Sequence, residues 1–479
     1  MHKLTRRSFV LSTAAAGTAL ATARPLPAAL ANDEIHLGMI GCGGRAGEHM
    51  GAFSKIPGVK IVGLCDPDEK RMADAKKRFP DADTYTDLRE LIDNKSINAV
   101  VIAACNHWHC LAAIWAMQAG KDVYVEKPLS HSQWEGEQTV AAARKYKRVC
   151  QVGTQQRSDP MQAEIKKFLH EEKSLGKLLT ARVNRYGYRG PIGKRDKPLE
   201  IDPSVAYDLW LGPAQKLPLY RNQLQYDWHW VWNTGSGEMG NWGVHVLDDL
   251  RNNVFLDKVT LPKRIFGGGG RVAMNDAGET PNVHFVYFDT GSIPVVIGLS
   301  NLGAQPDSKK SPKHPGPDSG YVVFCEGGRF EGQRGRAAAF DKDGKEIRKF
   351  TGNSGKGHQE NFIACVREGN PEKLNTDVLI GHHSTGWCNL ANIAYQTGSA
   401  YSVEASKQIK DEIWLGLLDE MQAHLRAHDV ELASSQIKLS PILEIDVHRE
   451  RFIGEHAEAA NKLLKREYRA PFVVPTIES

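Results

Sequence analysis

Residues 35–53 read IHLGMIGCGGRAGEHMGAF: a short apolar run, a glycine-rich turn and the start of a helix-like segment. Gly41, Gly43 and Ala46 match the G-x-G-x-x-G/A fingerprint of dinucleotide-binding folds. The first glycine permits the tight turn, the second lets a pyrophosphate approach the backbone, and the small third residue lets the helix pack closely. The glycine spacing alone is a weak signal, but a strand before it and a helix after it make the match specific. We expect this turn to bind a dinucleotide through Gly41, Gly43, Gly44 and Arg45.

The same alternation of strand-like and helix-like segments continues to about residue 152. Apolar, strand-like runs at 59–65, 99–104, 122–125 and 149–152 are separated by helix-like segments that include 69–79, 108–119 and 132–146. Residues 99–104 are apolar throughout, which is typical of a parallel strand buried on both faces. Repeated βαβ units predict a doubly wound parallel sheet. We therefore assign residues 33–157 to a Rossmann domain of the α/β class.

Asp66 ends the second predicted strand, where an acidic residue contacts the adenosine ribose in such folds. Its carboxylate would accept hydrogen bonds from the ribose hydroxyls and repel a 2′-phosphate, which favours NAD over NADP. Arg71 lies one helical turn further on and keeps NADP open as the less favoured alternative. A second interpretation of Asp66 is a helix cap before Pro67.

Lys127 follows the strand at 122–125 within the motif Glu126-Lys127-Pro128. Ligands bind at the carboxyl ends of strands in open α/β sheets, so this lysine is expected to point into the crevice beside the nicotinamide. Burial, and the positive charge of an oxidised nicotinamide, would both lower its pKa. The alternative is an ordinary surface lysine.

With these motifs the chain resembles the Gfo/Idh/MocA family of NAD(P)-dependent sugar and polyol oxidoreductases. The resemblance extends over nearly all of the chain beyond residue 31, and it is carried by 41–47, Asp66, 106–109, 126–128, 151–157, 241–248, 381–384 and 468–472. It implies a second domain built on an open, mainly antiparallel sheet. It also implies cofactor contacts from Asn106, His109 and Glu126, in addition to those of the glycine turn, Asp66 and Lys127.

The catalytic lysine of the family corresponds to Lys127, and its Asp-x-x-x-His segment corresponds to Asn241-x-x-x-His245. Residues four apart share a helix face, so Asn241 and His245 are expected to reach one cleft. An asparagine cannot act as a base. We therefore expect His245 to be the main acid/base, Lys127 to polarise the reacting oxygen and Asn241 to orient the substrate.

The second half of the chain has a different pattern, and we assign residues 158–400 to an α+β substrate-binding domain. Strand candidates include 178–186 and a hairpin of 282–288 with 293–299. Helix-like segments occur at 161–171, 358–368 and 380–397. Residues 401–479 are expected to form a helical tail that packs on the body. An open sheet would also offer a surface for a homo-oligomer.

Three tryptophans spaced by two, at 228, 230 and 232, would lie on one face of an extended segment. Aromatic faces suit the C–H surfaces of sugars, although core or interface packing is an equal alternative. We expect a carbohydrate substrate, with contacts from Arg157, Tyr186, Trp230, Trp232 and His245. Weaker candidates are Tyr188, Arg189, His229 and His382.

Composition narrows the class of protein. The 479 residues, 41% hydrophobic and 25% charged, are typical of a globular chain with two or more domains. Residues 1–31 hold four basic residues and no acid, so the remainder has 57 basic and 57 acidic residues and no net charge. This balance gives no support for a nucleic-acid partner. The eight cysteines form no CxxC pair and no zinc-type cluster, so we expect buried thiols and no metal site.

The leader predicts export. Arg6 and Arg7 lie in a twin-arginine pattern before an apolar run, and Ala29-Leu30-Ala31 suits cleavage after Ala31. The uncharged stretch at 9–23 has 15 residues, which is too short to span a bilayer. We expect a periplasmic or otherwise exported protein without a membrane span, recognised by the twin-arginine machinery. Because that route carries folded proteins, NAD is expected to be loaded first and to stay tightly bound.

The expected reaction is hydride transfer between NAD and a secondary alcohol carbon of a sugar, glycoside or polyol. Some family relatives are NAD-dependent glycosidases, so transient oxidation followed by elimination and hydrolysis is the alternative. A non-catalytic sugar-binding protein is a third hypothesis, for which Asn241 is the main support.

Overall fold

The parallel sheet begins with β1 (Ile35–Ile40), which pairs with β2 (Val59–Cys65) on one side and β4 (Ala99–Ile102) on the other. The remaining strands are β3 (Asp83–Tyr85), β5 (Asp122–Val125) and β6 (Cys150–Val152), and the order is β3-β2-β1-β4-β5-β6 with every pair parallel. This is the strand order of the doubly wound dinucleotide fold, so the predicted Rossmann domain is confirmed. The computed structural model describes residues 34–478; the predicted signal peptide, residues 1–31, lies outside the described residues.

Helices flank the sheet: α2 (Gly44–Phe53), α3 (Glu69–Arg78), α4 (Leu88–Asp93), α5 (His109–Gln118) and α6 (Gln133–Lys145). The sequence predicted α2, α3, α5 and α6 but neither α4 nor β3. Strand β3 has three residues, none of them buried, so no apolar run marked it. Every residue of β4 is buried, as its apolar sequence predicted.

The second sheet is mixed and mainly antiparallel, as predicted. Its core order is β14-β13-β12-β11-β7-β10-β9-β8, and of these pairs only β7 with β10 is parallel. The strands are β7 (Leu178–Tyr186), β8 (Arg264–Gly270), β9 (Val283–Asp289), β10 (Val295–Ser300), β11 (Ser319–Cys325), β12 (Gly328–Gln333), β13 (Arg336–Asp341) and β14 (Glu346–Thr351). Strand β8 escaped prediction because four of its seven residues are glycines, which are weak strand formers.

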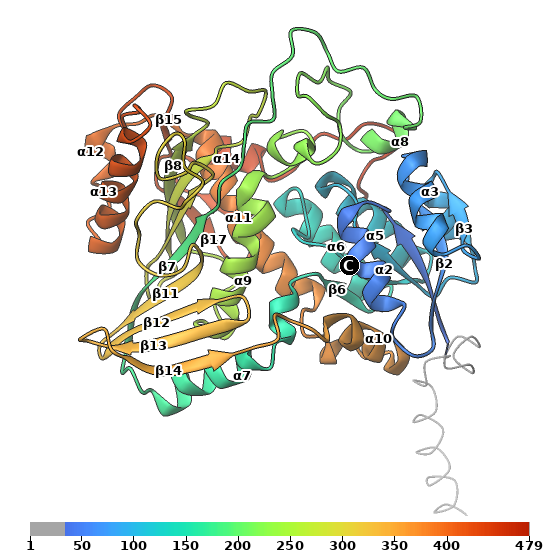
Figure 1. Cartoon of the computed structure of the whole chain (residues 1–479), viewed down its shortest axis with the longest axis horizontal. Coiled ribbons are helices and arrows are strands. Elements are labelled where there is room, and N and C mark those ends of the chain that lie inside the picture. Colours follow the sequence, from blue (N-terminus) through green and yellow to red (C-terminus); the bar gives the residue numbers. More distant parts are fainter. Residues whose placement is uncertain (1–33, 479) are drawn as a thin grey trace, which may run out of the picture. The chain divides into compact units, whose positions relative to one another are not determined.

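Two helices lie between the sheets, as Figure 1 shows. Helix α11 (Val378–Thr397) packs on α6 of the first half and on α9 (Val244–Asn253) and β8 of the second. Helix α9 in turn packs on β7 and β11. Helix α7 (Met161–Lys166) lies beside β14, α10 (His358–Glu368) beside α2, and α13 (Glu412–Arg426) beside β9 and β10. The side chains of α9 and α11 therefore connect the two halves.

The prediction that residues 401–479 form a helical tail is only partly correct. Besides α13 and α14 (Ala457–Lys462), this segment contains β16 (Lys438–Leu439), β17 (Leu443–Asp446) and β18 (Arg451–Ile453). Strands β16 and β17 both pair with β8 and extend the second sheet. The final residues return to the first half, where the Phe472 ring lies 5.5 Å from that of Trp108. Within residues 34–478, no helix combines the length and apolarity needed to cross a bilayer.

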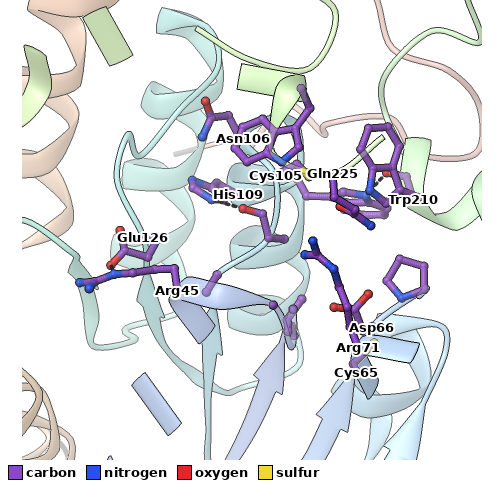
Figure 2. Close-up of a pocket in the computed structure, with 18 of the residues that line it drawn as sticks. Arg45, Cys65, Asp66, Arg71, Cys105, Asn106, His109, Glu126, Trp210 and Gln225 are labelled. Atoms are coloured by element: carbon purple, nitrogen blue, oxygen red, sulfur yellow. Dashed lines mark hydrogen bonds and ion pairs between the residues drawn. The ribbon is translucent and has the colours of Figure 1, made fainter. Parts of the chain in front are cut away.

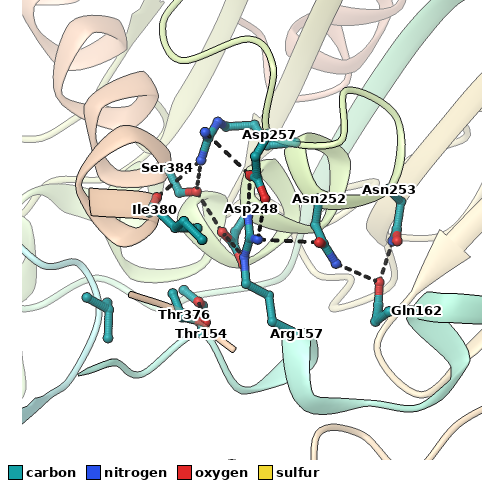
Figure 3. A network of polar contacts seen from close by, with 12 residues as sticks. Thr154, Arg157, Gln162, Asp248, Asn252, Asn253, Asp257, Thr376, Ile380 and Ser384 are labelled. Atoms are coloured by element: carbon teal, nitrogen blue, oxygen red, sulfur yellow. Dashed lines mark hydrogen bonds and ion pairs between the residues drawn. The ribbon is translucent and has the colours of Figure 1, made fainter. Parts of the chain in front are cut away.

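A buried ion-pair network joins the halves (Figure 3). Arg157, just after β6, donates through Nε to both oxygens of Asp248 on α9, at 2.8 and 2.9 Å. Its Nη atoms donate to Asp257 at 2.7 and 2.8 Å. Ser384 on α11 donates to Asp248 at 2.6 Å. The expectation that Arg157 binds substrate is not met, because its side chain is 3% exposed and its donors are committed to these carboxylates.

Replacing Arg157 should therefore destabilise the fold. In Arg157→Met the Asp248 carboxylate stays buried without its cation, and we expect the free energy of unfolding to fall by about 3–5 kcal/mol. The urea midpoint, followed by circular dichroism, measures the loss. The matched control is Arg449→Met, whose side chain is 78% exposed and should leave the midpoint unchanged. Equal midpoints for both variants would contradict a structural role for Arg157.

Candidate active site

The glycine turn after β1 leaves room for a phosphate. Gly41 has φ +91°, and a Cβ atom there would lie 2.6 Å from the carbonyl oxygen of Ala103, so only glycine fits. A Cβ atom on Gly44, the first residue of α2, would meet nothing within 4 Å. The backbone N–H groups at this helix N-terminus suit an anion. At Gly44 the turn thus offers open space and N–H donors for an anion such as a pyrophosphate, while the Arg71 guanidinium lies over Gly43.

A cavity of about 330 Å³ opens over this turn and over the ends of β1, β2, β4 and β5 (Figure 2). We call it the large cavity or, for the dinucleotide fold around it, the nucleotide-type cavity. All nine residues predicted to bind the cofactor line it: Gly41, Gly43, Gly44, Arg45, Asp66, Asn106, His109, Glu126 and Lys127. The structure therefore brings together all the residues that the sequence predicted for the cofactor site. Their contact with a nucleotide remains a prediction.

Asp66 lies at one end of this cavity with Arg71 beside it (Figure 2). Its carboxylate accepts hydrogen bonds from the backbone N–H groups of Cys42 at 2.7 Å and Asp68 at 2.9 Å. Burial nevertheless raises its pKa to about 6. The cap of α3 is Asp68, whose side chain accepts from Lys70 and Arg71. The helix-cap interpretation of Asp66 is therefore wrong, and this carboxylate lines the cavity instead.

Glu126 and Arg45 mark the other end (Figure 2). Glu126 Oε1 accepts from Arg45 at 2.8 Å and from Gln155 at 3.0 Å, and it lies 2.8 Å from His49 Nε2. Burial alone would raise the pKa of Glu126, but Arg45 and His49 hold it well below its ordinary value. Glu126 is thus a buried carboxylate that fixes Arg45 at the cavity wall.

Asn106 and His109 are held by their neighbours. The Asn106 side-chain oxygen accepts from the hydroxyl of Ser236 at 3.1 Å. The two ring nitrogens of His109 lie 2.7 Å from the Pro128 carbonyl oxygen and 3.1 Å from that of Ala104. Burial lowers the pKa of His109. His109 thereby fixes the loop that carries Lys127, and Asn106 connects the cavity wall to Ser236 of the second half.

Lys127 contacts the second half of the chain directly. Its Nζ donates to the backbone carbonyl of Asn241 at 2.8 Å and to the side-chain oxygen of Asn241 at 3.4 Å. Burial lowers the pKa of Lys127, and the nearby Arg45 adds to the effect, while Glu126 opposes it. A lysine with a lowered pKa gives up its proton more readily than an exposed lysine does.

A buried carboxylate that the sequence motif did not reveal orients Asn241. Glu238, which is 0% exposed, accepts from the Asn241 amide nitrogen at 3.1 Å. Its other oxygen accepts from Arg185 at 2.6 Å and Arg189 at 3.3 Å. Because the amide nitrogen faces Glu238, the amide oxygen faces Lys127. The carboxylate that the family motif would carry at 241 is replaced here by an asparagine held against Glu238, one turn earlier.

His245 is placed differently from the prediction. Asn241 lines the large cavity, whereas His245 lines a separate space of about 20 Å³ together with Trp242 and Gln155. Burial holds the pKa of His245 well below its ordinary value, and the charge of Lys127 lowers it further. The imidazole is therefore neutral, and its lowered pKa makes it a weaker base than an exposed histidine. It lies near Lys127 without forming part of the same wall.

The predicted row of tryptophans does not form, because residues 227–230 adopt a 3₁₀ turn instead of an extended strand. Trp228 lines the large cavity and stacks on His229 with 3.6 Å between ring centroids. Trp230 is 4% exposed and packs beneath Arg189. Trp232 lines a different cavity. The expectation that Trp230 and Trp232 share one substrate surface is therefore wrong.

The prediction that Tyr186 contacts the substrate is also wrong, because the neighbouring residue of β7, Arg185, faces the site instead. The Tyr186 ring packs against His314, with centroids 4.3 Å apart, on the face of the sheet that α13 covers. Successive side chains of a strand point to opposite faces, so it is Arg185 that reaches Glu238. His382 is occupied as well, because it pairs with Glu450 at 2.6 Å.

Comparison with known proteins agrees with this geometry. Residues 35–154 match the model of the oxidoreductase family with an NAD-binding Rossmann fold, Gfo/Idh/MocA. Inositol 2-dehydrogenase 2 of Saccharopolyspora erythraea is 31% identical over 153 residues, which cover 32% of this chain and 45% of that protein. A glycosyl hydrolase family 109 protein of Shewanella baltica is 28% identical over 179 residues, covering 31% and 39%. The chain thus spans about half the length, or less, of these curated relatives.

The fold likeness extends beyond the first half. The structure of the WlbA dehydrogenase from Bordetella pertussis, in complex with NADH and UDP-GlcNAcA, aligns with a TM-score of 0.54 at 18% identity. The alignment covers 74% of this chain and 94% of that chain. At this identity the match concerns the fold.

The titration of Asp66 provides a test of the nucleotide site. Because its pKa is raised to about 6, the carboxylate becomes protonated as the pH falls through that value and can no longer accept two ribose hydrogen bonds. We expect NAD affinity, measured by calorimetry, to weaken below pH 6, and we expect Asp66→Asn to bind weakly at every pH. The control Asp74→Asn, whose side chain is 76% exposed, should keep the wild-type profile. A wild-type affinity in Asp66→Asn would rule out the ribose contact.

Proposed function

We propose that this chain, whose residues 35–154 form an NAD-binding Rossmann domain of the Gfo/Idh/MocA oxidoreductase family, moves a hydride to or from a secondary alcohol carbon of a sugar, glycoside or polyol. One observation carries the proposal. Lys127 leaves the carboxyl end of β5 on the wall of the nucleotide-type cavity and is hydrogen-bonded to Asn241 from the other half of the chain. A substrate entering between the halves meets both groups.

The residues divide the work as follows. NAD, held by the residues of the cavity, would supply the acceptor or donor for the hydride of the alcohol carbon. In oxidation the neutral amine of Lys127, favoured by its lowered pKa, accepts the hydroxyl proton, and in reduction the ammonium returns it to the oxygen. Asn241, held by Glu238, offers its amide oxygen to Lys127 and to a substrate hydroxyl. His245 stays a neutral imidazole in the adjoining space near Lys127, so the proton passes through Lys127 and not through the histidine.

NAD is the proposed cofactor because Asp66 presents a carboxylate where a 2′-phosphate would otherwise lie. Arg71 extends across Gly43, since a Cβ atom there would lie 2.3 Å from Arg71 Nη1. An arginine at this point stacks over or pairs with the nucleotide without removing the repulsion from Asp66. The twin-arginine pattern at Arg6 and Arg7 supports export to the periplasm with NAD already bound.

A second activity has specific support. The similarity to a glycosyl hydrolase family 109 protein favours NAD-dependent glycoside hydrolysis, in which the sugar is oxidised transiently, the glycosidic bond is eliminated and the hydride is returned. Products distinguish the two: net oxidation changes the bound nucleotide, and hydrolysis splits the glycoside without doing so. Tight binding is tested by extracting nucleotide from the purified protein. Recovery of a nucleotide-free protein that needs added NAD would contradict it.

Lys127→Met is the direct test of the proposed chemistry. We expect the variant to retain NAD and to lose about 10²–10⁴-fold in the rate at which myo-inositol or methyl glucosides change bound-NADH absorbance or release free sugar, because the reacting hydroxyl loses the group that exchanges its proton. His245→Asn should lose less, since its ring lies outside the large cavity. The control Lys462→Met is on the exposed side of α14. Wild-type turnover in Lys127→Met would contradict the catalytic role of Lys127 and favour a non-catalytic sugar-binding protein.

A further inference from the structure

A second large cavity, of about 380 Å³, lies on the other side of the segment 232–236 from the nucleotide-type cavity. Ser236 belongs to its wall while donating to Asn106, which lines the first cavity. The rest of the wall comes from α11, the loop before α6 and the C-terminal segment 463–467. Its volume lies in the range of small-molecule sites, about 300–1,000 Å³.

One face of α11 supplies an unusual set of polar groups to this cavity. Asn389, Asn392, Ile393 and Gln396 line it at helical spacing. The neighbouring positions Trp387, Leu390, Ala391 and Ala394 of the same helix are all 0% exposed and apolar. A helix buried between two sheets would ordinarily be apolar on every inward face. Buried polar side chains also occur earlier on this helix, at His382, Ser384 and Thr385, but each of those is hydrogen-bonded within the protein.

These amides have their nitrogens occupied and their oxygens free. Asn389 donates its amide nitrogen to Ser130 at 3.2 Å, and Asn392 donates to the Ser236 carbonyl at 2.9 Å. Gln396 donates to the Asn392 backbone at 3.3 Å. Within residues 34–478, none of the three side-chain oxygens accepts a hydrogen bond. Because these residues line the cavity, their three oxygens can accept hydrogen bonds from the hydroxyl groups of a ligand there.

The opposite wall carries a donor and an aromatic ring. Arg466 lines the cavity, and in the described part of the chain its guanidinium makes no hydrogen bond. Burial lowers its pKa, and the negative charges of Glu135 and of Glu279, which also lines the cavity, oppose this. Trp232, half-buried, lines the same space. Acceptors for hydroxyl groups, a fork of N–H donors and a flat apolar face are together the groups that a sugar ring uses.

From this juxtaposition we propose that the cavity between α11, Trp232 and Arg466 is a second carbohydrate site, which takes one monosaccharide unit. The hydroxyls of the sugar donate to the free oxygens of Asn389, Asn392 and Gln396, and its C–H face packs on Trp232. Arg466 donates to hydroxyl oxygens of a neutral sugar or pairs with the carboxylate of a uronic acid. The site binds without catalysing, since Lys127 lies in the other cavity. It does not depend on the proposed hydride transfer.

Two tryptophans allow the two cavities to be followed separately. Trp228 lines the nucleotide-type cavity and Trp232 lines the second one. In the full chain labelled with 5-fluorotryptophan, their ¹⁹F resonances are assigned from Trp228→Phe and Trp232→Phe. We expect D-glucose or D-glucuronate to shift the Trp232 resonance saturably, and NAD to shift that of Trp228.

Variants of the wall decide the outcome. Gln396→Leu and Arg466→Met should each weaken the sugar-dependent shift of Trp232 at least tenfold, with Arg466→Met affecting glucuronate more than glucose. Gln408→Leu, on the surface, and Lys127→Met should leave it unchanged. A Trp232 resonance that neither sugar moves, or an affinity that neither wall variant alters, overturns the second site. The two proposals can also fail separately. If Lys127→Met loses turnover but keeps the Trp232 shift, the second site is independent of the proposed hydride transfer.

Discussion

The 2.8 Å hydrogen bond from the Lys127 ammonium to Asn241 is the contact on which the candidate site depends. It joins the carboxyl end of a parallel strand to the turn that begins α9, and so sets the spacing between the nucleotide-type cavity and the second sheet. Lys127 lies two residues after β5. The backbone of β5 is fixed by its pairing with β4 and β6. The ammonium is thus positioned close to the end of the sheet, on a loop that the His109 contact to Pro128 and its own bond to Asn241 hold in place.

The charges around this contact are balanced in pairs. Glu126 is matched by Arg45 on the cofactor side, and Glu238 by Arg185 and Arg189 on the substrate side. Unpaired, either buried carboxylate would be costly. Paired, they hold Arg45 and the Asn241 amide in fixed orientations, so that polar groups are in place before a substrate arrives. The Arg157–Asp248 pair performs the corresponding structural task below the site, between β6 and α9.

The cofactor side was predictable from the sequence because each signal is local. Gly41, Asp66 and Lys127 all lie at the ends of parallel strands, and such ends meet at one edge of the sheet whatever the rest of the chain does. The substrate side was less predictable because it depends on register and on distant pairing. Tyr186 and Arg185 are adjacent in sequence yet face opposite sides of β7. Nothing in the sequence marks Glu238 as the partner of Asn241, since the pair becomes significant only when Arg185 and Arg189 converge on it.

Isotope transfer is the decisive test of hydride transfer at Lys127. Purified protein with its bound nucleotide is incubated with myo-inositol or methyl glucoside deuterated at carbon, and the nucleotide is then released and weighed by mass spectrometry. If Lys127 supports hydride transfer, deuterium appears in the nicotinamide bound to the wild-type protein and not in the nicotinamide bound to Lys127→Met. Bound NAD that gains no deuterium from any of these sugars, or gains it equally in the variant, would contradict hydride transfer at this lysine.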